Sequence, residues 1–361
     1  MKRTIAAILC LISVFAFPLR AKALSVSASS AVVIEAESGR VIYEKDAHTR
    51  RGMASTTKIM TALCAIENMA LDTVVTVPRE AVGVEGSSVY LKEGEQISLE
   101  DLLYALMLQS ANDAAAAIAI AVSGSIEDFA SLMNEKAEAL GLTDTHFENP
   151  HGLDGSEHYT TAYELAKIAA YALENEDFAR IVSTKMWKIK GSDGSAPRSL
   201  VNHNRLLREY NDIIGVKTGF TRKCGRTLVS AARRDGVTLV CVTLNDGDDW
   251  RDHRAMLDFG FDLYENEELC AEGELLFELP VVGGEKSSVK VSNREALFAA
   301  LEKNHGVISV KTELPQFVYA GQKKELPIGK ARFFCDGREI GCAALYLDEE
   351  IAVKAKKKLF K

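Results

Sequence analysis

The feature that most constrains this chain is a hydrophobic periodicity that changes twice. Residues 31–44 and 213–242 contain short apolar runs separated by polar, Gly-containing turns, which is the pattern of β-hairpins. Residues 81–210 instead are mainly of helical pattern, and a final segment, 250–264, is a further helix candidate. Strands from both ends of this region therefore surround a helical insertion. We predict that residues 24–265 form an α/β domain with helices packed on a sheet.

A smaller domain follows the first. From about residue 267 the composition shifts to short strand-like segments with Gly-containing turns. This predicts a separate β-rich domain over residues 266–348, with one helix near 294–303. Its titratable residues form no cluster to which we can assign chemistry.

The last stretch, 349–361, is basic and has a narrow apolar side. Five lysines surround Ile351, Ala355 and Leu359. Each lysine contributes about 1 kcal/mol near an anionic membrane surface, but the apolar side is small for stable insertion. We therefore predict reversible, salt-sensitive contact of this tail with anionic membranes.

Residues 1–23 have the three parts of a secretory signal peptide. Two basic residues come first, an apolar run follows from 5 to 17, and Ala21-Lys-Ala supplies a small-x-small cleavage site. The apolar run is too short to span a bilayer. We expect export to the outer face of the cytoplasmic membrane, the cell wall or the periplasmic space.

Charge and cysteine content exclude several functions. Removal of residues 1–23 takes away four basic residues and changes the formal net charge from −8 to −12, so nucleic-acid binding is not expected. Six cysteines remain, without the close-set pairs that bind metal. Cys335 and Cys342 flank a predicted hairpin turn, but its register places Cys342 opposite Ala331. We expect no disulfide framework, no metal and no cofactor.

Ser55 and Lys58 lie at the predicted start of a helix, where they can form a nucleophile and its base. From Thr56 the apolar residues follow helical spacing through Ala70. Positions three apart share a helix face, so a neutral Lys58 amine can accept the proton of the Ser55 hydroxyl, which needs an adjacent base to become nucleophilic. The N–H groups of a first helical turn lack intrahelical partners and can hold an oxyanion.

A second Ser-x-x-Lys match, Ser287 and Lys290, shows that the spacing alone proves little. At Ser and Lys frequencies of roughly 6–7%, one or two matches are expected by chance. The stretch around Ser287 alternates polar and apolar residues as a strand does, and there positions three apart point to opposite faces. We therefore expect chemistry at Ser55 only.

Two further motifs follow in the chain: Ser110-Ala-Asn between two predicted helices, and Lys217-Thr-Gly on a predicted strand. The three motifs together resemble those of the penicilloyl-serine transferases, which include penicillin-binding proteins and serine β-lactamases. The closer resemblance is to the low-molecular-weight penicillin-binding proteins that are D-alanyl-D-alanine carboxypeptidases. The sequence segments that carry this resemblance are Ala54-Ser-Thr-Thr-Lys-Ile-Met-Thr, Asp101-Leu-Leu-Tyr-Ala-Leu-Met-Leu-Gln-Ser-Ala-Asn-Asp-Ala, Asn149-Pro-His-Gly-Leu-Asp, His158-Tyr-Thr-Thr-Ala and Gly215-Val-Lys-Thr-Gly-Phe-Thr.

The resemblance implies a fold and ligands. Residues about 28–265 are similar to that family's catalytic domain, a β-lactamase/transpeptidase-like sheet, and about 267–347 to its C-terminal β domain. The implied substrate is a peptidoglycan stem peptide ending in D-Ala-D-Ala, and β-lactam antibiotics are the implied covalent ligands. Ala111 and Cys224 depart from the family, which more often has Gly and Ala there, and Cys224 should place a thiol near the rim of the site.

Chemistry and resemblance together imply a role for each site residue. Ser55 would attack the carbonyl of the penultimate D-alanine, and Lys58 would be its base, kept neutral by desolvation and by the cation Lys217. Ser110 would relay a proton to the leaving D-alanine nitrogen. Asn112 would bind the acyl-chain amide, and Lys217 and Thr218 would bind the terminal carboxylate, for which Arg251 is a further candidate. Gly219 would allow close approach of the substrate. The backbone N–H groups of Ser55 and Phe220 would bind the oxyanion.

Two other functions share parts of this pattern. A serine β-lactamase has the same motifs but must deacylate rapidly, and class A enzymes use a further Glu for this step. Glu148 lies in roughly the right interval, yet its setting belongs to the carboxypeptidase-like segment. The second alternative is a non-catalytic wall-binding or antibiotic-sensing module, against which the complete motifs argue. We predict a serine D-alanyl-D-alanine carboxypeptidase.

Overall fold

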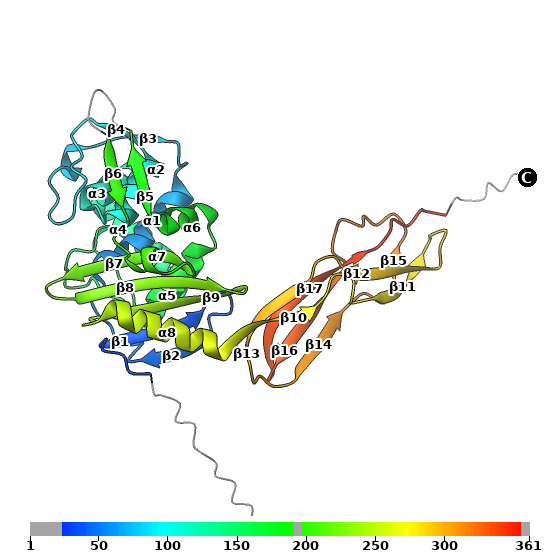
Figure 1. Ribbon diagram of the computed structural model, residues 1–361. Coiled ribbons are helices and arrows are strands. Elements are labelled where there is room, and N and C mark those ends of the chain that lie inside the picture. The colour runs from blue at the N-terminus through cyan, green and yellow to red at the C-terminus, as the bar shows by residue number, and fades with distance from the viewer. Residues whose placement is uncertain (1–23, 191–196, 355–361) are drawn as a thin grey trace, which may run out of the picture.

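A five-stranded antiparallel sheet lies at the centre of the first domain (Figure 1). In this computed structural model, residues 24–190 and 197–354 are described, and the predicted signal peptide lies outside them. The strand order is β2-β1-β9-β8-β7, so strands from both ends of the domain meet in one sheet, as predicted. The strands are β1 (Ser30–Glu35), β2 (Val41–Lys45), β7 (Ile213–Thr221), β8 (Gly225–Arg234) and β9 (Val237–Leu244).

Alternate side chains of the sheet enter two separate cores. Val32 and Ile34 of β1 pack toward the helical insertion, whereas Ala31 and Val33 pack toward α8 (Asp249–Leu263) on the opposite face. Full burial of a Val or Ile side chain contributes about 1.5–3 kcal/mol to stability. Both faces of the sheet are therefore covered, which holds β7 in a fixed place beside the helices.

The helical insertion surrounds one central helix. The 3-10 turn η1 (Ala54–Thr57) leads into α1 (Lys58–Asn68), whose first eight residues are all buried. Ser98 begins α2 by accepting a hydrogen bond from the Asp101 N–H. The other elements are η2 (Arg79–Ala81), α2 (Leu99–Leu108), α3 (Asn112–Ser123), α4 (Ile126–Ala139), α5 (Ala162–Leu173), α6 (Glu176–Ser183), α7 (Leu206–Glu209), and the strand pairs β3 (Val74–Thr76) with β4 (Gln96–Ser98) and β5 (Met186–Ile189) with β6 (Arg198–Val201).

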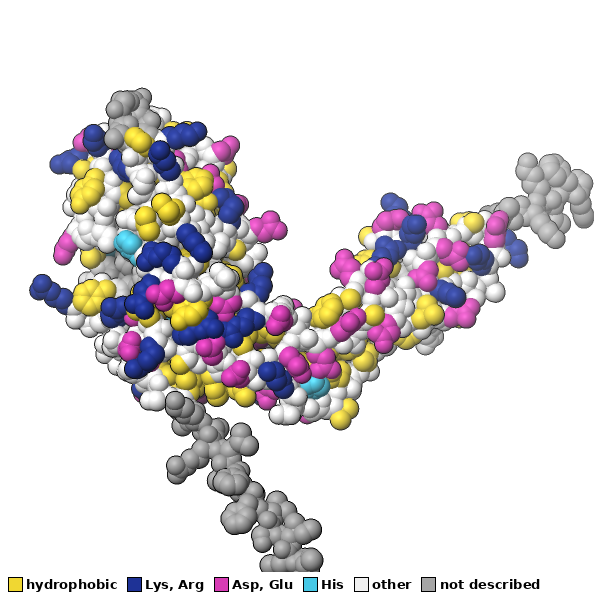
Figure 2. Space-filling view, in the orientation of Figure 1, with side chains coloured by type: hydrophobic (Ala, Val, Ile, Leu, Met, Phe, Trp, Pro, Cys, Tyr) yellow, Lys and Arg dark blue, Asp and Glu magenta, His cyan; other side chains and the backbone are white. Residues whose placement is uncertain are grey.

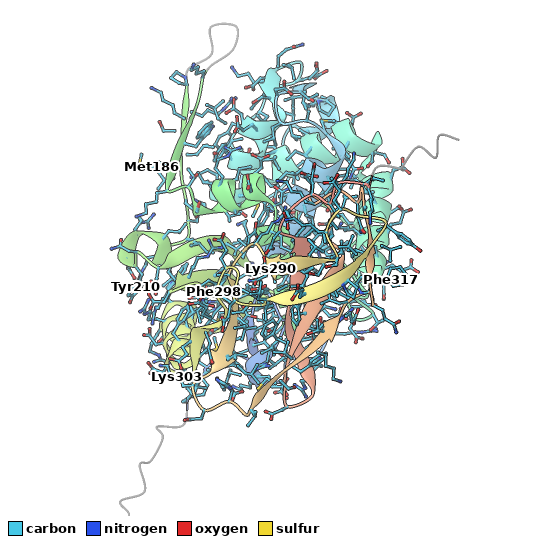
Figure 3. All side chains as sticks on the ribbon, turned by 90° about the vertical axis from the view of Figure 1, so that its right-hand side faces the viewer. Met186, Tyr210, Lys290, Phe298, Lys303 and Phe317 are labelled. Atoms are coloured by element: carbon cyan, nitrogen blue, oxygen red, sulfur yellow. The ribbon has the colours of Figure 1, made fainter. Side chains whose placement is uncertain are left out.

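The second domain is elongated and contains two sheets (Figure 1). The backbone N–H and the Nζ of Lys303 donate to the Leu263 and Asp262 carbonyls, both at 2.9 Å, where the domains meet (Figure 3). A pair of strands, β10 (Tyr264–Cys270) and β13 (Leu297–Glu302), lies next to the first domain. A six-stranded sheet follows in the order β14-β16-β17-β12-β11-β15. Its strands are β11 (Phe277–Val282), β12 (Ser288–Asn293), β14 (Ile308–Glu313), β15 (Val318–Tyr319), β16 (Gly329–Cys335) and β17 (Arg338–Leu347).

The prediction of a helix near 294–303 is wrong. This segment forms β13, which pairs antiparallel with β10. Its side chains alternate, because Ala299 and Leu301 are buried whereas Phe298 is exposed. The pairing with β10 supplies the backbone hydrogen bonds that a helix would have made internally, so tertiary context overrides the local helical pattern.

Two smaller predictions in this domain also need correction. Cys342 stands opposite Arg332 rather than Ala331, because the pairing of β16 with β17 skips Ile340 next to Phe333 and Phe334 and so shifts the register by one. Ile351, assigned to the apolar side of the tail, is buried in the domain core with 3% exposure. The predicted tail therefore loses one of its apolar residues, and its remainder from residue 355 lies outside the described part of the chain.

Within residues 24–190 and 197–354, no one helix has the length and apolar character needed to cross a membrane, and α3 and α4 meet that test only as a pair bent by 82°. On the face drawn in Figure 2, acidic and basic side chains are interspersed over both domains.

Candidate active site

The turn that carries Ser55 is bound on two sides. Thr227 of β8 donates a hydrogen bond to the Met53 carbonyl at 3.1 Å, which ties η1 to the sheet. On the other side, a side chain at Gly152 would overlap the Ala54 carbonyl, so the loop that follows α4 can pack there only with glycine. Ser55 is consequently fixed between the sheet and this loop.

Lys58 is fully buried beside Ser55. Its Nζ lies 3.0 Å from Ser55 Oγ and 2.7 Å from Asn112 Oδ1, and it also contacts the His151 carbonyl oxygen. The amide and carbonyl oxygens can only accept hydrogen bonds, whereas a hydroxyl can also donate. A neutral amine has two hydrogens and one lone pair. Its hydrogens therefore go to Asn112 and His151, and its lone pair is left for the Ser55 hydroxyl.

The pKa of Lys58 is lowered well below its usual value. Burial is the larger cause and the neighbouring cation Lys217 is the second, while the Asp113 carboxylate acts in the opposite direction. Burial also lowers the pKa of Lys217 to about 7. The lowered pKa of Lys58 favours the neutral amine that a general base requires, and at pH 7 Lys217 is close to half-protonated.

Ser110 lies on the same cleft as Ser55. The cleft has a volume of about 510 Å³ and is lined by Ser55, Ser87, Ser110, His203, Thr218, Gly219, Phe220, Arg226, Asp249 and Trp250. Ser110 follows α2 with φ of +58°, a conformation uncommon for residues with a side chain. A strained residue between two helices at a cleft is typical of a functional position.

Strand β7 forms one wall of the cleft. A Cβ at Gly219 would lie 2.9 Å from the Ser55 nitrogen and 3.1 Å from the Thr56 nitrogen. Only glycine therefore lets β7 come this close to the N-terminal turn of the helix. Phe220, the next residue, is 64% exposed. The predicted oxyanion donors, the N–H groups of Ser55 and Phe220, belong to these two adjoining segments.

Two predicted binding residues lie beneath the cleft surface. The Asn112 side chain is used twice, because Oδ1 accepts from Lys58 and Nδ2 donates to the Glu85 carbonyl. Lys217 is 1% exposed, and its Nζ donates to the Thr218 carbonyl at 2.8 Å. Asn112 thus contacts the base directly, and a contact with the acyl-chain amide would require one of its present bonds to change.

The structure does not bring Arg251 to the cleft. Its side chain is 66% exposed and pairs with Asp248 at 2.9 Å and Asp252 at 3.1 Å. The guanidinium that lines the cleft is that of Arg226, which stands opposite Phe220 in the sheet and binds Asp249. Sequence reasoning missed Arg226, although pairing across the 221–225 turn would have indicated it.

Sequence reasoning also missed Ser87, His203 and Trp250 in the cleft lining. Burial and the cations Lys217 and Arg208 lower the pKa of His203. These three residues come from separate loops and a helix start, and none belongs to a motif that could be recognised from spacing. Their placement depends on tertiary packing.

Cys224 does not line the cleft that contains Ser55, and it belongs instead to a second pocket, with Gly52 and Asp154. It is 8% exposed, and its thiol donates to Asp154 Oδ1 at 3.1 Å. A side chain at Gly52 would overlap its Sγ, so the thiol packs against the backbone that leads to Ser55. Burial, the largest effect, raises the pKa of this thiol.

Comparison with known proteins agrees with this geometry. A family model for D-alanyl-D-alanine carboxypeptidases, peptidase family S11, matches residues 18–248. The chain belongs to this family. Residues 264–353 match the model of the C-terminal domain of penicillin-binding protein 5, so the chain is a low-molecular-weight penicillin-binding protein. The predicted family, fold class and serine carboxypeptidase assignment are confirmed.

Individual relatives support the same assignment. The D-alanyl-D-alanine carboxypeptidase DacF of Bacillus subtilis is 30% identical over 345 residues, which cover 93% of this chain and 86% of that protein. Penicillin-binding protein 5 from Haemophilus influenzae has a similar structure, with a TM-score of 0.70 and 26% identity over 91% of this chain and 98% of that one. The Streptomyces K15 DD-transpeptidase matches with a TM-score of 0.63 and 32% identity over 66% of this chain and 98% of its own.

Proposed function

We propose that this protein removes the terminal D-alanine from peptidoglycan stem pentapeptides through an acyl-enzyme on Ser55. The observation that carries this proposal is the environment of Lys58 Nζ, whose two acceptor partners leave its lone pair for Ser55. Family membership supports the reaction class, and the buried, neutral amine supplies the base that a serine nucleophile requires.

In the acylation step, Ser55 Oγ bonds to the carbonyl carbon of the penultimate D-alanine as its proton passes to Lys58. The carbonyl oxygen becomes an oxyanion between the N–H groups of Ser55 and Phe220. Collapse then breaks the C–N bond, and the proton held by Lys58 reaches the leaving nitrogen through Ser110. Free D-alanine departs, and the rest of the peptide stays as an ester of Ser55.

In the second step, water replaces D-alanine. Lys58, neutral again, takes a proton from the attacking water, and collapse of the second tetrahedral intermediate returns a proton to Ser55 Oγ. The products are a peptide shortened by one residue and the free enzyme. Penicillin would acylate Ser55 in the same way, because its lactam carbonyl stands in for the peptide carbonyl and opening of the ring leaves the ester attached.

Strand β7 is proposed to hold the substrate. An extended peptide can add to this strand as a further edge, since Gly219 has no side chain to obstruct it. The terminal carboxylate would lie near Thr218, above the Lys217 amine. Arg226 is the guanidinium placed to meet an anionic group on this wall, and its bond to Asp249 fixes its position.

The position of Glu148 does not favour a class A β-lactamase. A side chain at Gly155 would overlap Glu148 Oε2, so this carboxylate packs against the Gly155 loop. The Glu148 N–H donates to His158, whose other ring nitrogen lies 2.7 Å from Thr57 Oγ1. Glu148 is therefore separated from the cleft lining by His158 and η1, and we propose slow release of penicillin rather than rapid turnover.

Export through residues 1–23 is the second part of the proposal. The substrate of this family lies outside the cytoplasmic membrane, and the basic, apolar and small-x-small segments of this stretch support cleavage after Ala23. The N-terminal sequence of the mature protein tests it. A protein that begins at Leu24 supports cleavage, and one that retains residues 1–23 contradicts it.

The C-terminal end is proposed to contact anionic membranes weakly. Burial of Ile351 reduces the apolar side of the tail, but Tyr319 and Val353 are 62% and 65% exposed beside the point where the described chain ends. Co-sedimentation with anionic vesicles tests this contact. Binding that disappears at high salt and on deletion of 355–361, which leaves the buried Ile351 in place, supports it, whereas salt-resistant binding, or none at low salt, contradicts it.

One pair of assays tests the central activity. The purified mature protein is incubated with a peptide ending in D-Ala-D-Ala and, separately, with penicillin. We expect catalytic D-alanine release and one-to-one penicillin labelling. Rapid penicillin turnover without D-alanine release would show a β-lactamase instead.

A further inference from the structure

The loop Glu85–Leu91 is bound by two consecutive residues at the start of α3. The first is Asn112, whose backbone N–H donates to the Ser87 carbonyl at 2.7 Å and whose Nδ2 donates to the Glu85 carbonyl. A Cβ at Gly86, where φ is +99°, would lie 2.6 Å from this same Nδ2. The loop and the Asn112 amide are therefore in direct contact.

The second residue is Asp113, whose carboxylate is 1% exposed. It accepts hydrogen bonds from the N–H groups of Val89 and Leu91 at 3.2 and 3.0 Å and from the Ser88 hydroxyl at 2.6 Å. It also accepts from the Ala114 N–H at 2.9 Å, which belongs to its own helix. One buried carboxylate thus holds three residues of the loop, Ser88, Val89 and Leu91, against the N-terminus of α3.

These contacts determine which way the Asn112 amide points. A carbonyl oxygen such as that of Glu85 can only accept, so it must face the NH₂ group of Asn112. The Asn112 oxygen is then the atom that faces Lys58, 2.7 Å away. Lys58 must donate a hydrogen there, and with its other hydrogen on the His151 carbonyl, the lone pair is directed at Ser55.

We propose that Asp113 is a positioning residue for the general base. By holding the loop Glu85–Leu91 in place, it fixes the Asn112 amide with its oxygen toward Lys58 and so directs the Lys58 lone pair at the Ser55 hydroxyl. This inference rests on the proposed function, in which Lys58 is the base. Asp113 touches neither the substrate nor Ser55, and it acts through the loop and Asn112.

The charge of Asp113 also affects the pKa of Lys58, which packing of the loop alone would not do. The groups that face Lys58 are Lys217 from β7, Asp113 from α3, and His151 and His158 from the loop after α4. Burial lowers the pKa of both histidines, to about 3 and about 4, so they are neutral at working pH. Asp113 raises the pKa of Lys58 while Lys217 lowers it. Loss of the Asp113 charge should therefore lower the pKa of Lys58 further.

The test begins with Asp113→Asn and the rate constant for acylation by penicillin. Its amide would present NH₂ to loop N–H groups and loosen the loop, so we expect acylation at neutral pH to fall about tenfold to a hundredfold, as displacement of a catalytic group by about 1 Å does. The acid limb of the pH–rate profile should move to lower pH. A wild-type rate and profile in the folded variant would overturn the proposal.

A matched pair of glycine variants tests the loop contact without touching Asp113. Gly86→Ala places a methyl group against the Asn112 amide, whereas Gly83→Ala imposes the same kind of strain at φ of +79° with no atom within 4 Å of the new group. We expect Gly86→Ala alone to slow acylation. Equal rates in the two variants would overturn the proposal even if Asp113→Asn does not fold. Ser55→Ala distinguishes failure of the proposed function from failure of this inference. Penicillin labelling that survives in Ser55→Ala would refute the proposed function itself, whereas the Asp113 and Gly86 variants test only the positioning role of Asp113.

Discussion

The chain contains two Ser-x-x-Lys pairs, and the contrast between them shows what makes such a pair reactive. Lys58 is fully buried on a helix with its Nζ 3.0 Å from Ser55 Oγ. Lys290 lies on the exposed side of β12 in the second domain (Figure 3), and Ser287, also exposed, directly precedes that strand. Burial and a neighbouring cation lower the pKa of Lys58. The same four-residue spacing therefore gives a base in one domain and a surface pair in the other.

The largest difference between the pairs should come from the serines. We expect Ser55→Ala to abolish penicillin labelling and to lower D-alanine release by at least about 10⁴-fold, since loss of the nucleophile of a serine protease costs about 10⁶ in kcat. Ser287→Ala should leave both at wild-type levels. Mass spectrometry of the labelled protein and a D-alanine assay measure the two effects, and a large loss in Ser287→Ala would remove the contrast.

Replacement of the lysines should separate the pairs almost as strongly. Lys58→Arg keeps a positive charge, but arginine stays protonated at any working pH and cannot accept the Ser55 proton. We expect a loss of acylation on the order of 10³-fold or more, near that of removing a member of a catalytic triad. Lys290→Arg is the control and should have no effect. Near wild-type acylation by Lys58→Arg would rule out Lys58 as the base.

The third difference is the close approach of β7 to the Ser55 turn. Gly219→Ala would place a methyl group 2.9 Å from the Ser55 nitrogen. Removal of one oxyanion donor costs about 10²- to 10³-fold in rate, and we expect a loss of that size in both acylation and hydrolysis. Gly247→Ala, whose methyl group would meet its nearest atom only at 3.9 Å, is the control. Equal rates in the two variants would mean that the oxyanion lies elsewhere.

The smallest expected effect concerns the second cation of the site, Lys217. A charge-assisted hydrogen bond is worth about 1.5–3 kcal/mol, so Lys217→Ala should lower kcat/KM for a D-Ala-D-Ala peptide by about tenfold to a hundredfold. Because Lys217 binds a carboxylate only when protonated and its pKa is about 7, wild-type kcat/KM should fall as pH rises through about 7. If the fall of kcat/KM above pH 7 persists in Lys217→Ala, the group that titrates is not Lys217.

The sequence predicts most of the first domain, because its elements have clear periodicity and turn residues. It also predicts the residues nearest the chemistry, since Ser55, Lys58 and Lys217 belong to short motifs on a helix start and a strand. It does not predict the contacts that orient Lys58. The His151 carbonyl is a backbone atom that any residue could supply, and the roles of Asn112 and Asp113 depend on how a distant loop packs.

The errors have the same origin. Arg251 is a candidate for the carboxylate by its residue type, but the first turn of α8 directs its side chain toward Asp248 and solvent. Segment 297–302 has residues that suit a helix, yet β10 offers it a strand partner. In both cases the local sequence does not determine the outcome. The direction of the Arg251 side chain and the strand pairing of segment 297–302 are set by the rest of the fold.

The most direct measurement of the central claim is the pH dependence of the rate constant for acylation by penicillin. A buried Lys58 that is already neutral predicts an acid limb well below the ordinary lysine pKa of about 10.4, so that acylation is close to its maximum at neutral pH. A rate that rises about tenfold for each pH unit from 6 to 9 would show that the base ionises as a solvated lysine does. That result would contradict the assignment of Lys58 as a desolvated base.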